Sequence, residues 1–391
     1  MNTLKSIIFA TLISMSFIMG AASAQTPVKI GFVAELSGPT GGLGQDQYDG
    51  FMLFVERNGG KLGGVPVQVI KEDSAGKIEV ATQVVQKLIE KENVPIITGI
   101  TLSNIMMAIH KPITEKQVFL ISSLAGPSPI AGAQCSPYQF ITSWQNDQLS
   151  EVMGKYASDK GYKRLYVMAA NVQGGRDFVA GFKRYYKGQI VDEVYTPLTQ
   201  QDFSAEMAQL QSARPDAVFA FYAGALAINF MRQYQQAGLL KNVPLLTAGI
   251  ADGSTMPALK ETALGIVGGA PWTPDLDNPA NRRFVEEFEK KYNRIPASMA
   301  AYSYDAAQLL DSALAKVKGN VGDKKAFMAA LKAADFPSVR GKFKFASNHF
   351  PVHDLHLQEV ARDAKGRVSL KKVSTPLPDL SDVYYPQCAM K

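Results

Sequence analysis

The sequence predicts an α/β protein built from two doubly wound lobes. Short apolar runs rich in β-branched residues alternate with amphipathic stretches along most of the 391-residue chain. The apolar runs are continuous, which is typical of parallel strands that are buried on both faces. The chain is also too long for one compact core and has about the length expected for two.

The predicted strands follow from these apolar runs, and the first of them ends in a glycine-rich turn. Val28–Leu36 runs into the turn from Ser37 to Gly44, directly before a helix. A strand that feeds such a turn at a helix N-terminus is suited to binding anions and small polar groups. Further buried strands are expected at Val65–Ile70, Val94–Ile100, Val118–Ser122, Leu165–Ala170, Ala217–Tyr222 and Pro244–Ile250.

The predicted helices fill the gaps between the strands. In each of them, apolar residues return at intervals of three and four. These helices are Gln45–Asn58, Lys77–Glu92, Ser103–Glu115, Asp147–Lys160, Gly175–Lys187, Phe203–Ala213, Ala225–Ala237 and Asn278–Tyr292.

Three Pro-rich or aromatic segments interrupt the alternation, and we expect them to cross between the lobes. They are Tyr138–Trp144, Ala270–Asp275 and about Phe345–His353, the last followed by a hairpin that turns at Asp363–Gly366. We therefore expect lobe 1 to hold residues 25–143 and 273–345, and lobe 2 to hold residues 144–272 and 346–374. Residues 375–391 contain Pro376, Pro378 and Pro386 and are expected to form an extended coil tail.

Residues 1–24 have the layout of a cleavable secretory signal peptide. Lys5 precedes an apolar stretch from Ile7 to Met19, and Ala22-Ser23-Ala24 precedes Gln25. We therefore expect the mature protein to be soluble in the periplasm. No cysteine lies near the cleavage site, so a lipid-anchored form is not expected.

The formal charge of +6 is spread along the chain, with only short basic pairs such as Lys290-Lys291 and Lys371-Lys372. Such a distribution gives little support to nucleic-acid binding. We expect a monomer without a nucleic-acid partner.

The sequence also lacks the patterns of several catalytic and metal sites. It contains no G-x-S-x-G elbow and no H-E-x-x-H motif, and its glycine turn lacks the G-x-G-x-x-G spacing of dinucleotide-binding proteins. His349, His353 and His356 fit the predicted hairpin better than a metal-binding helix, because His353 and His356 would face opposite sides of a strand. We expect no cofactor, no metal and no catalytic residues.

Cys135 and Cys388 are the two cysteines of the chain. The first lies in a Pro-flanked loop and the second near the C-terminus, and export would place both in an oxidising compartment. We predict a disulfide that holds the tail to the first lobe. The alternative is two free thiols.

A series of short motifs also runs through the mature chain. Their order and spacing resemble those of type I periplasmic binding proteins of the branched-chain amino acid (Leu/Ile/Val-binding) ABC transport group. The resemblance implies two Rossmann-like lobes joined by three crossovers, with a ligand trapped between them and the closed form delivered to a membrane permease. The motifs are Ser37-Gly38-Pro39 with Gly44, Asp49-Gly50-Phe51, Asn58-Gly59-Gly60, Val94–Thr101 with Ser103, Phe119–Ser122, Gly175-Arg176-Asp177, Asp202-Phe203-Ser204, Gln236–Leu239, Phe284–Phe288 with Tyr292, and Tyr304-Asp305-Ala306.

The resemblance assigns carboxylate binding to Ser103, which starts a helix directly after a strand. The matching Ser of that family holds the ligand carboxylate, and the free N–H groups of the first helical turn would assist it. The alternative is that Ser103 is a plain N-cap. Leu124, Ala125 and Gly126 end the next strand at the same sheet edge, where doubly wound folds bind ligands.

The sequence departs from the amino-acid binders that it resembles at two positions that hold the α-ammonium group. It has Gly126 where they carry Thr, and Ile250 or Ala251 where they carry an acidic residue. A buried ammonium group without partners costs roughly several kcal/mol. An α-amino acid is therefore not the expected ligand.

In the second lobe, the positions that match the family's site are Gly174, Tyr222 and Ala223. Tyr222 would offer a wall for a flat apolar group. The small residues Gly126, Gly174 and Ala223 would widen the slot, while Leu43, Leu102 and Ile250 would line it. The alternative for each is ordinary packing of strand ends, and Trp144, Trp272, Met299 and Tyr302 fit hinge packing equally well.

We therefore expect an ABC importer's binding protein that holds a small aromatic carboxylate such as benzoate, a hydroxybenzoate or a phenylpropanoid acid. Asn171, Gln173 and Thr247 are candidate partners for a ring hydroxyl. The sequence leaves open an amino-acid or aliphatic carboxylate ligand, a sensory receptor and an extracytoplasmic enzyme.

Overall fold

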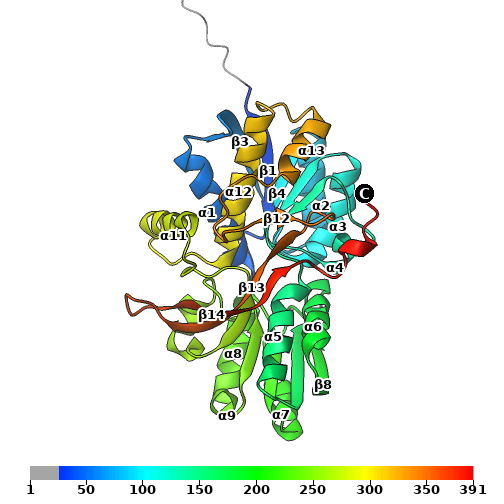
Figure 1. Cartoon of the computed structure of the whole chain (residues 1–391). Helices are drawn as coiled ribbons and strands as arrows, with labels where there is room; N and C mark the ends of the chain where they lie inside the picture. Colours follow the sequence, from blue (N-terminus) through cyan, green and yellow to red (C-terminus); the bar gives the residue numbers. More distant parts are fainter. Residues whose placement is uncertain (1–25, 391) are drawn as a thin grey trace, which may run out of the picture.

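The structure is a computed structural model that describes residues 26–390, and it consists of two α/β lobes (Figure 1). The predicted signal peptide, residues 1–24, lies outside the described residues. Within the described chain, the first lobe holds a six-stranded sheet that is parallel except for the β2–β3 pair. In spatial order its strands are β2 (Lys61–Leu62), β3 (Val65–Asp73), β1 (Val28–Ala34), β4 (Ile96–Gly99), β5 (Phe119–Ser122) and β6 (Gln139–Ile141).

The second lobe of the described chain holds an eight-stranded sheet. Five neighbouring strands run parallel, and an antiparallel hairpin extends the sheet beyond β11. In spatial order the strands are β12 (Lys344–Phe345), β13 (Pro351–Arg362), β11 (Val267–Ala270), β10 (Leu245–Ala248), β9 (Ala217–Phe221), β7 (Arg164–Ala170) and β8 (Gln189–Thr196), with β14 (Val368–Leu380) paired to β13.

Amphipathic helices pack on both sheets (Figure 1). With the first sheet lie α1 (Gly41–Arg57), α2 (Ile78–Glu90), α3 (Ser103–Glu115), α4 (Ser128–Ala131), α11 (Pro279–Tyr292), α12 (Ser298–Lys316) and α13 (Lys324–Lys332). With the second lie α5 (Asp147–Asp159), α6 (Gln173–Tyr185), α7 (Ser204–Ala213), α8 (Gly224–Gln236), α9 (Leu239–Asn242), α10 (Met256–Leu259) and the short 3₁₀ helix η1 (Lys260–Ala263).

The observed architecture confirms the predicted fold class of two doubly wound α/β lobes. The hairpin turn at Asp363–Gly366 is also confirmed, since Gly366 N–H donates to Asp363 O. The sequence analysis missed β6, which lies inside the predicted crossing Tyr138–Trp144 and belongs to the first sheet. It also missed β8, β11, α12 and α13 and the short elements β2, β12, α4, α9 and α10. The residue-by-residue division into lobes stays a prediction.

The prediction of a coil tail from residue 375 is wrong for its first part, because β14 continues to Leu380 and pairs with β13. β14 carries Pro376 and Pro378 and pairs with β13 alone. Proline is tolerated in such an edge strand, where its missing N–H is not needed for a second ladder of hydrogen bonds.

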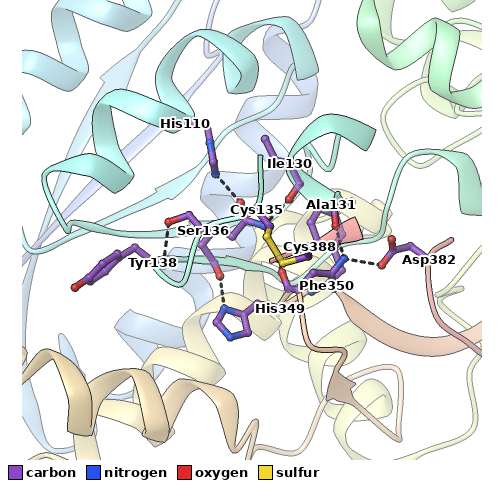
Figure 2. Close-up of a disulfide and its surroundings, with 12 residues drawn as sticks. His110, Ile130, Ala131, Cys135, Ser136, Tyr138, His349, Phe350, Asp382 and Cys388 are labelled. Atoms are coloured by element: carbon purple, nitrogen blue, oxygen red, sulfur yellow. Dashed lines mark hydrogen bonds between the residues drawn. A yellow bond between two sulfur atoms is a disulfide. The ribbon is translucent and has the colours of Figure 1, made fainter. Parts of the chain in front are cut away.

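The predicted disulfide is present and joins Cys135, in the loop after α4, to Cys388, after the 3₁₀ helix η2 (Tyr385–Gln387) (Figure 2). The segment just before Cys388 also contacts the second lobe, because Tyr384 Oη donates to Asp147 Oδ2 of α5 at 2.9 Å. The end of the described chain therefore links both lobes.

Candidate functional site

A cavity of about 120 Å³ lies between the two lobes. Its walls come from the ends of strands and the starts of helices. The second lobe contributes the carboxyl ends of β7, β9 and β11, and both lobes contribute the first residues of helices such as α3, α6 and α12. This is the crevice at which doubly wound sheets generally bind ligands.

Seven of the residues predicted to bind the ligand line this cavity. The first lobe supplies Leu43, Leu102, Ser103, Leu124 and Ala125, and the second lobe supplies Gly174 and Ala223. The structure thus brings together residues that lie up to 180 positions apart in the sequence. Their role in binding stays a prediction.

Gly126, Tyr222 and Ile250 do not line the cavity. A Cβ atom at Gly126 would lie 2.1 Å from Trp144 O, so this glycine permits close contact with the first crossing instead of widening the slot. Tyr222 and Ile250 are fully buried in the hydrophobic core of the second lobe. Thr196 Oγ1 lies 3.2 Å from Tyr222 Oη.

The aromatic wall is formed by Phe178 and Phe221 instead of Tyr222. The two rings stack with centroids 3.9 Å apart and an interplanar angle of 12°. Side chains alternate between the two faces of a strand, so Phe221 faces the same side as Ala223, and Tyr222 faces the other. This alternation was the signal that could have identified Phe221.

The polar end of the cavity lies where the N-termini of α3 and α6 approach each other. A Cβ atom at Gly174, near the start of α6, would lie only 3.4 Å from Ser103 Oγ at the start of α3. Each helix has 13 residues, and the unpaired N–H groups and dipole at a helix N-terminus favour an anion. Two such termini at one end of a cavity are suited to a carboxylate.

The Ser103 side chain is not an N-cap. Leu102 occupies the N-cap position of α3, and no side chain caps this helix. Ser103 Oγ instead accepts a hydrogen bond from Asn146 Nδ2 at 3.0 Å. Asn146 Nδ2 also donates to Asp177 Oδ2, so this amide, which the sequence analysis missed, links α3 of the first lobe to α6 of the second.

Direct contacts between the lobes surround the cavity. Ser128 Oγ in the first lobe donates to Asp177 Oδ1 in the second at 2.7 Å, and Ala225 N–H in the second lobe donates to Pro39 O at 3.1 Å. Burial raises the pKa of the Asp177 carboxyl. The lobes are therefore closed on each other.

Of the large residues that were predicted to lie near the crossings, some line the cavity and one packs outside it. Trp144, Met299 and Tyr302 line the cavity, and the rings of Trp144 and Tyr302 meet edge to face at 4.9 Å. Trp272 does not line it, and its Nε1 donates to Asn281 Oδ1 at 2.6 Å.

The residues expected to bind a ring hydroxyl do not line the cavity. Asn171 Oδ1 accepts from Arg176, Gln173 Nε2 donates to Asp177 Oδ1, and Thr247 Oγ1 donates to Val267 O. The cavity wall holds Gln358 of β13 instead.

An acidic side chain does line the cavity, although the sequence analysis placed Ile250 or Ala251 where the amino-acid binders carry their acidic residue. Asp252 lies two residues beyond Ile250, and its Oδ1 accepts from Ser254 N–H at 2.6 Å. Burial raises the pKa of its carboxyl. The argument against an α-amino acid is weakened, because an ammonium group in this cavity would have an acidic neighbour.

The described residues contain no group of three or more His, Cys, Asp or Glu side chains that could hold a metal ion. Each hairpin-region histidine has a protein neighbour. His349 Nδ1 lies 2.9 Å from Gln139 O, His353 Nδ1 lies 3.2 Å from Arg340 Nη1, and His356 Nδ1 lies 3.0 Å from Thr375 Oγ1. Between residues 26 and 390, no helix combines the length and hydropathy of a membrane span.

Comparison with known proteins agrees with this geometry. The family model described as "Periplasmic binding protein" matches residues 27–366. The Leu/Ile/Val-binding protein homolog 6 of Brucella melitensis is 28% identical over 383 residues, covering 95% of this chain and 97% of the relative.

Solved structures extend the comparison. A solute-binding protein of an ABC transporter from R. palustris, in complex with benzoate, is 31% identical with a TM-score of 0.88 and covers 93% of this chain and 100% of its own. Another, from Rhodopseudomonas palustris in complex with 3,4-dihydroxybenzoic acid, is 25% identical with a TM-score of 0.84 and covers 91% of this chain and 99% of its own. This chain therefore belongs to the periplasmic binding protein family, as a type I member of the branched-chain amino acid group.

Proposed function

We propose that this chain is the binding protein of an ABC importer and traps a small aromatic carboxylate between its lobes. The observation that carries the proposal is the cavity, which combines an apolar wall containing the stacked rings of Phe178 and Phe221 with two helix N-termini at one end. Its volume of about 120 Å³ is comparable with an engineered apolar cavity of about 150 Å³ that binds benzene. One aromatic ring and one carboxylate match the apolar wall and the polar end of this cavity.

The similar solved structures support the same ligand class, since their ligands are benzoate and 3,4-dihydroxybenzoic acid. Both solved proteins are solute-binding proteins of ABC transporters. A membrane permease is therefore the partner that we propose for the closed form. Family membership also supports a periplasmic location and a binding role rather than an enzymatic one.

A branched-chain amino acid is the second candidate ligand, and Asp252 favours it. Its buried carboxyl lies in the cavity wall, where it could pair with an α-ammonium group. Desolvation raises the pKa of Asp252, which works against the charged carboxylate that such a pair requires. We therefore place the aromatic acids first.

A thermal-shift screen of the purified mature protein tests the ligand class. Benzoate, hydroxybenzoates and cinnamate are expected to raise the Tm, and leucine and valine are not. A ligand at 100 times its Kd stabilises the folded state by about 2.7 kcal/mol, which is a shift of several degrees. A shift with leucine or valine and none with the aromatic acids would overturn the assignment. Recovery of the bound acid unchanged and in stoichiometric amount would argue against an enzyme.

Replacing Ser103 with Ala is expected to weaken binding of the aromatic carboxylate by about tenfold or more. The change removes a hydroxyl at the polar end of the cavity, and a hydrogen bond to a charged group contributes about 1.5–3 kcal/mol. Isothermal titration calorimetry with benzoate measures the effect. Ser204→Ala is the matched control, because Ser204 is the first residue of α7 as Ser103 is of α3, but lies outside the cavity. Equal affinities of the two variants would contradict the assigned role.

A further inference from the structure

Three buried polar atoms on residues that line the cavity have no hydrogen-bond partner among the described residues. They are Trp144 Nε1, Gln358 Oε1 and Asp252 Oδ2. The three residues are only 6%, 7% and 4% exposed. Buried polar groups in folded proteins are nearly always paired, so each of these atoms calls for a specific explanation.

The two tryptophans of the chain differ in whether their indole N–H has a hydrogen-bond partner. Trp272 lies outside the cavity, and its Nε1 has a partner, Asn281 Oδ1. Trp144 lines the cavity, and its Nε1 has none. The unpaired indole N–H is therefore associated with the ligand site.

The residues that carry these atoms lie on elements other than those that form the anion-binding end of the cavity. Trp144 lies in the loop between β6 and α5, Asp252 in the loop after β10 and Gln358 on β13, whereas the proposed carboxylate site is built from α3 and α6. A Cβ atom at Gly268 of β11 would lie 3.4 Å from Gln358 Nε2, which places the Gln358 amide against the neighbouring strand. An unsubstituted ring would itself offer none of these atoms a hydrogen-bond partner.

A hydroxyl group on the ring matches this set of atoms. A hydroxyl is both a donor and an acceptor. It can accept from Trp144 Nε1–H and donate to an oxygen such as Gln358 Oε1 or Asp252 Oδ2. A neutral hydroxyl also does not require Asp252 to be charged in its buried position.

We propose that the ligand carries at least one ring hydroxyl, and that Trp144 and Gln358 are specificity residues that distinguish hydroxybenzoates from benzoate. This inference rests on the proposed function and narrows its ligand class. A site whose buried polar groups bind a hydroxyl discriminates strongly against an analogue that lacks it, because those groups are then left unpaired.

Calorimetric titration of the wild-type protein with benzoate, 3-hydroxybenzoate, 4-hydroxybenzoate and 3,4-dihydroxybenzoate tests the inference. At least one hydroxylated acid is expected to bind ten times more tightly than benzoate. Trp144→Phe removes the indole N–H and keeps one aromatic ring, and Gln358→Met removes the amide and keeps the length of the side chain. Each is expected to reduce the ratio of hydroxybenzoate to benzoate affinity at least fivefold.

Tyr222→Phe is the matched control, because it removes a buried hydroxyl that lies in the core of the second lobe and outside the cavity. Its affinity ratio is expected to equal that of the wild type. Equal binding of benzoate and every hydroxybenzoate would overturn the inference while leaving the proposed function intact. No binding of any aromatic acid would overturn the proposed function itself.

A wild-type preference that survives both substitutions would overturn the assignment of Trp144 and Gln358. The comparison of ligands on the wild-type protein requires no variant, so it decides the ligand class even where a variant does not fold.

Discussion

Replacing Arg340 with Met is expected to lower the free energy of unfolding by about 3–5 kcal/mol, the effect typical of breaking a buried ion pair. Arg340 Nε lies 3.2 Å from Asp305 Oδ2 of α12, and the two side chains are 1% and 0% exposed. The substitution leaves the Asp305 carboxylate buried without its counter-charge.

The same arginine also donates hydrogen bonds to the loop between β6 and α5. Its Nη1 donates to Ser143 O at 2.7 Å, and its Nη2 donates to Thr142 O. Methionine cannot donate to either carbonyl, so the substitution removes hydrogen bonds as well as the charge. The predicted effect is therefore much larger than that of a surface ion pair.

Urea unfolding followed by circular dichroism measures this prediction. Arg362→Met is the matched control, because Arg362 pairs with Glu261 at 2.6 Å while both side chains remain more than half exposed. Such exposed pairs contribute about 0–1 kcal/mol. A loss for Arg340→Met no larger than that of the control would contradict the prediction. Asp305→Leu added to Arg340→Met is expected to recover part of the loss, because no buried charge is left unpaired.

The fold could be predicted because local sequence patterns determine much of it. Buried parallel strands read as continuous apolar runs, and their carboxyl ends share one sheet edge, so the strand pattern placed Ser103 and Leu124 at one edge of the first sheet. Gly174 of the second lobe was placed at the site only by the family resemblance. The strand β11 was missed because its sequence is Val-Gly-Gly-Ala, and glycine is uncommon in strands. The structure gives the reason for Gly269, since a Cβ atom there would lie 2.0 Å from Leu149 O.

The rest of the site depends on contacts between distant segments. Trp144, Asp252 and Gln358 lie in different parts of the sequence, and only the crossings and the β13–β14 hairpin bring them to one cavity. A single sequence contains no signal that these three residues lie close together in the fold. The sequence analysis assigned the aromatic wall to Tyr222 instead of Phe221 for a different reason. A shift of one residue along a strand turns the side chain to the opposite face.

Removing the disulfide with Cys135→Ser and Cys388→Ser together is expected to lower the free energy of unfolding by about 2–5 kcal/mol. The bond joins residues 253 positions apart, and closing so long a loop removes much of the conformational freedom of the unfolded chain. It also holds a segment whose Asp382 accepts from Asn348 Nδ2 at 2.9 Å and whose Tyr384 contacts α5. Both contacts are expected to weaken in the variant.

Chemical unfolding with and without a reducing agent measures this effect. Reduction should lower the stability of the wild-type protein towards that of the double variant and leave the double variant unchanged, which separates loss of the bond from general effects of the reductant. Alkylation and mass spectrometry of the non-reduced mature protein should detect no free thiol. Two alkylated cysteines, or equal stability of wild type and double variant, would show that the bond does not hold the C-terminal segment.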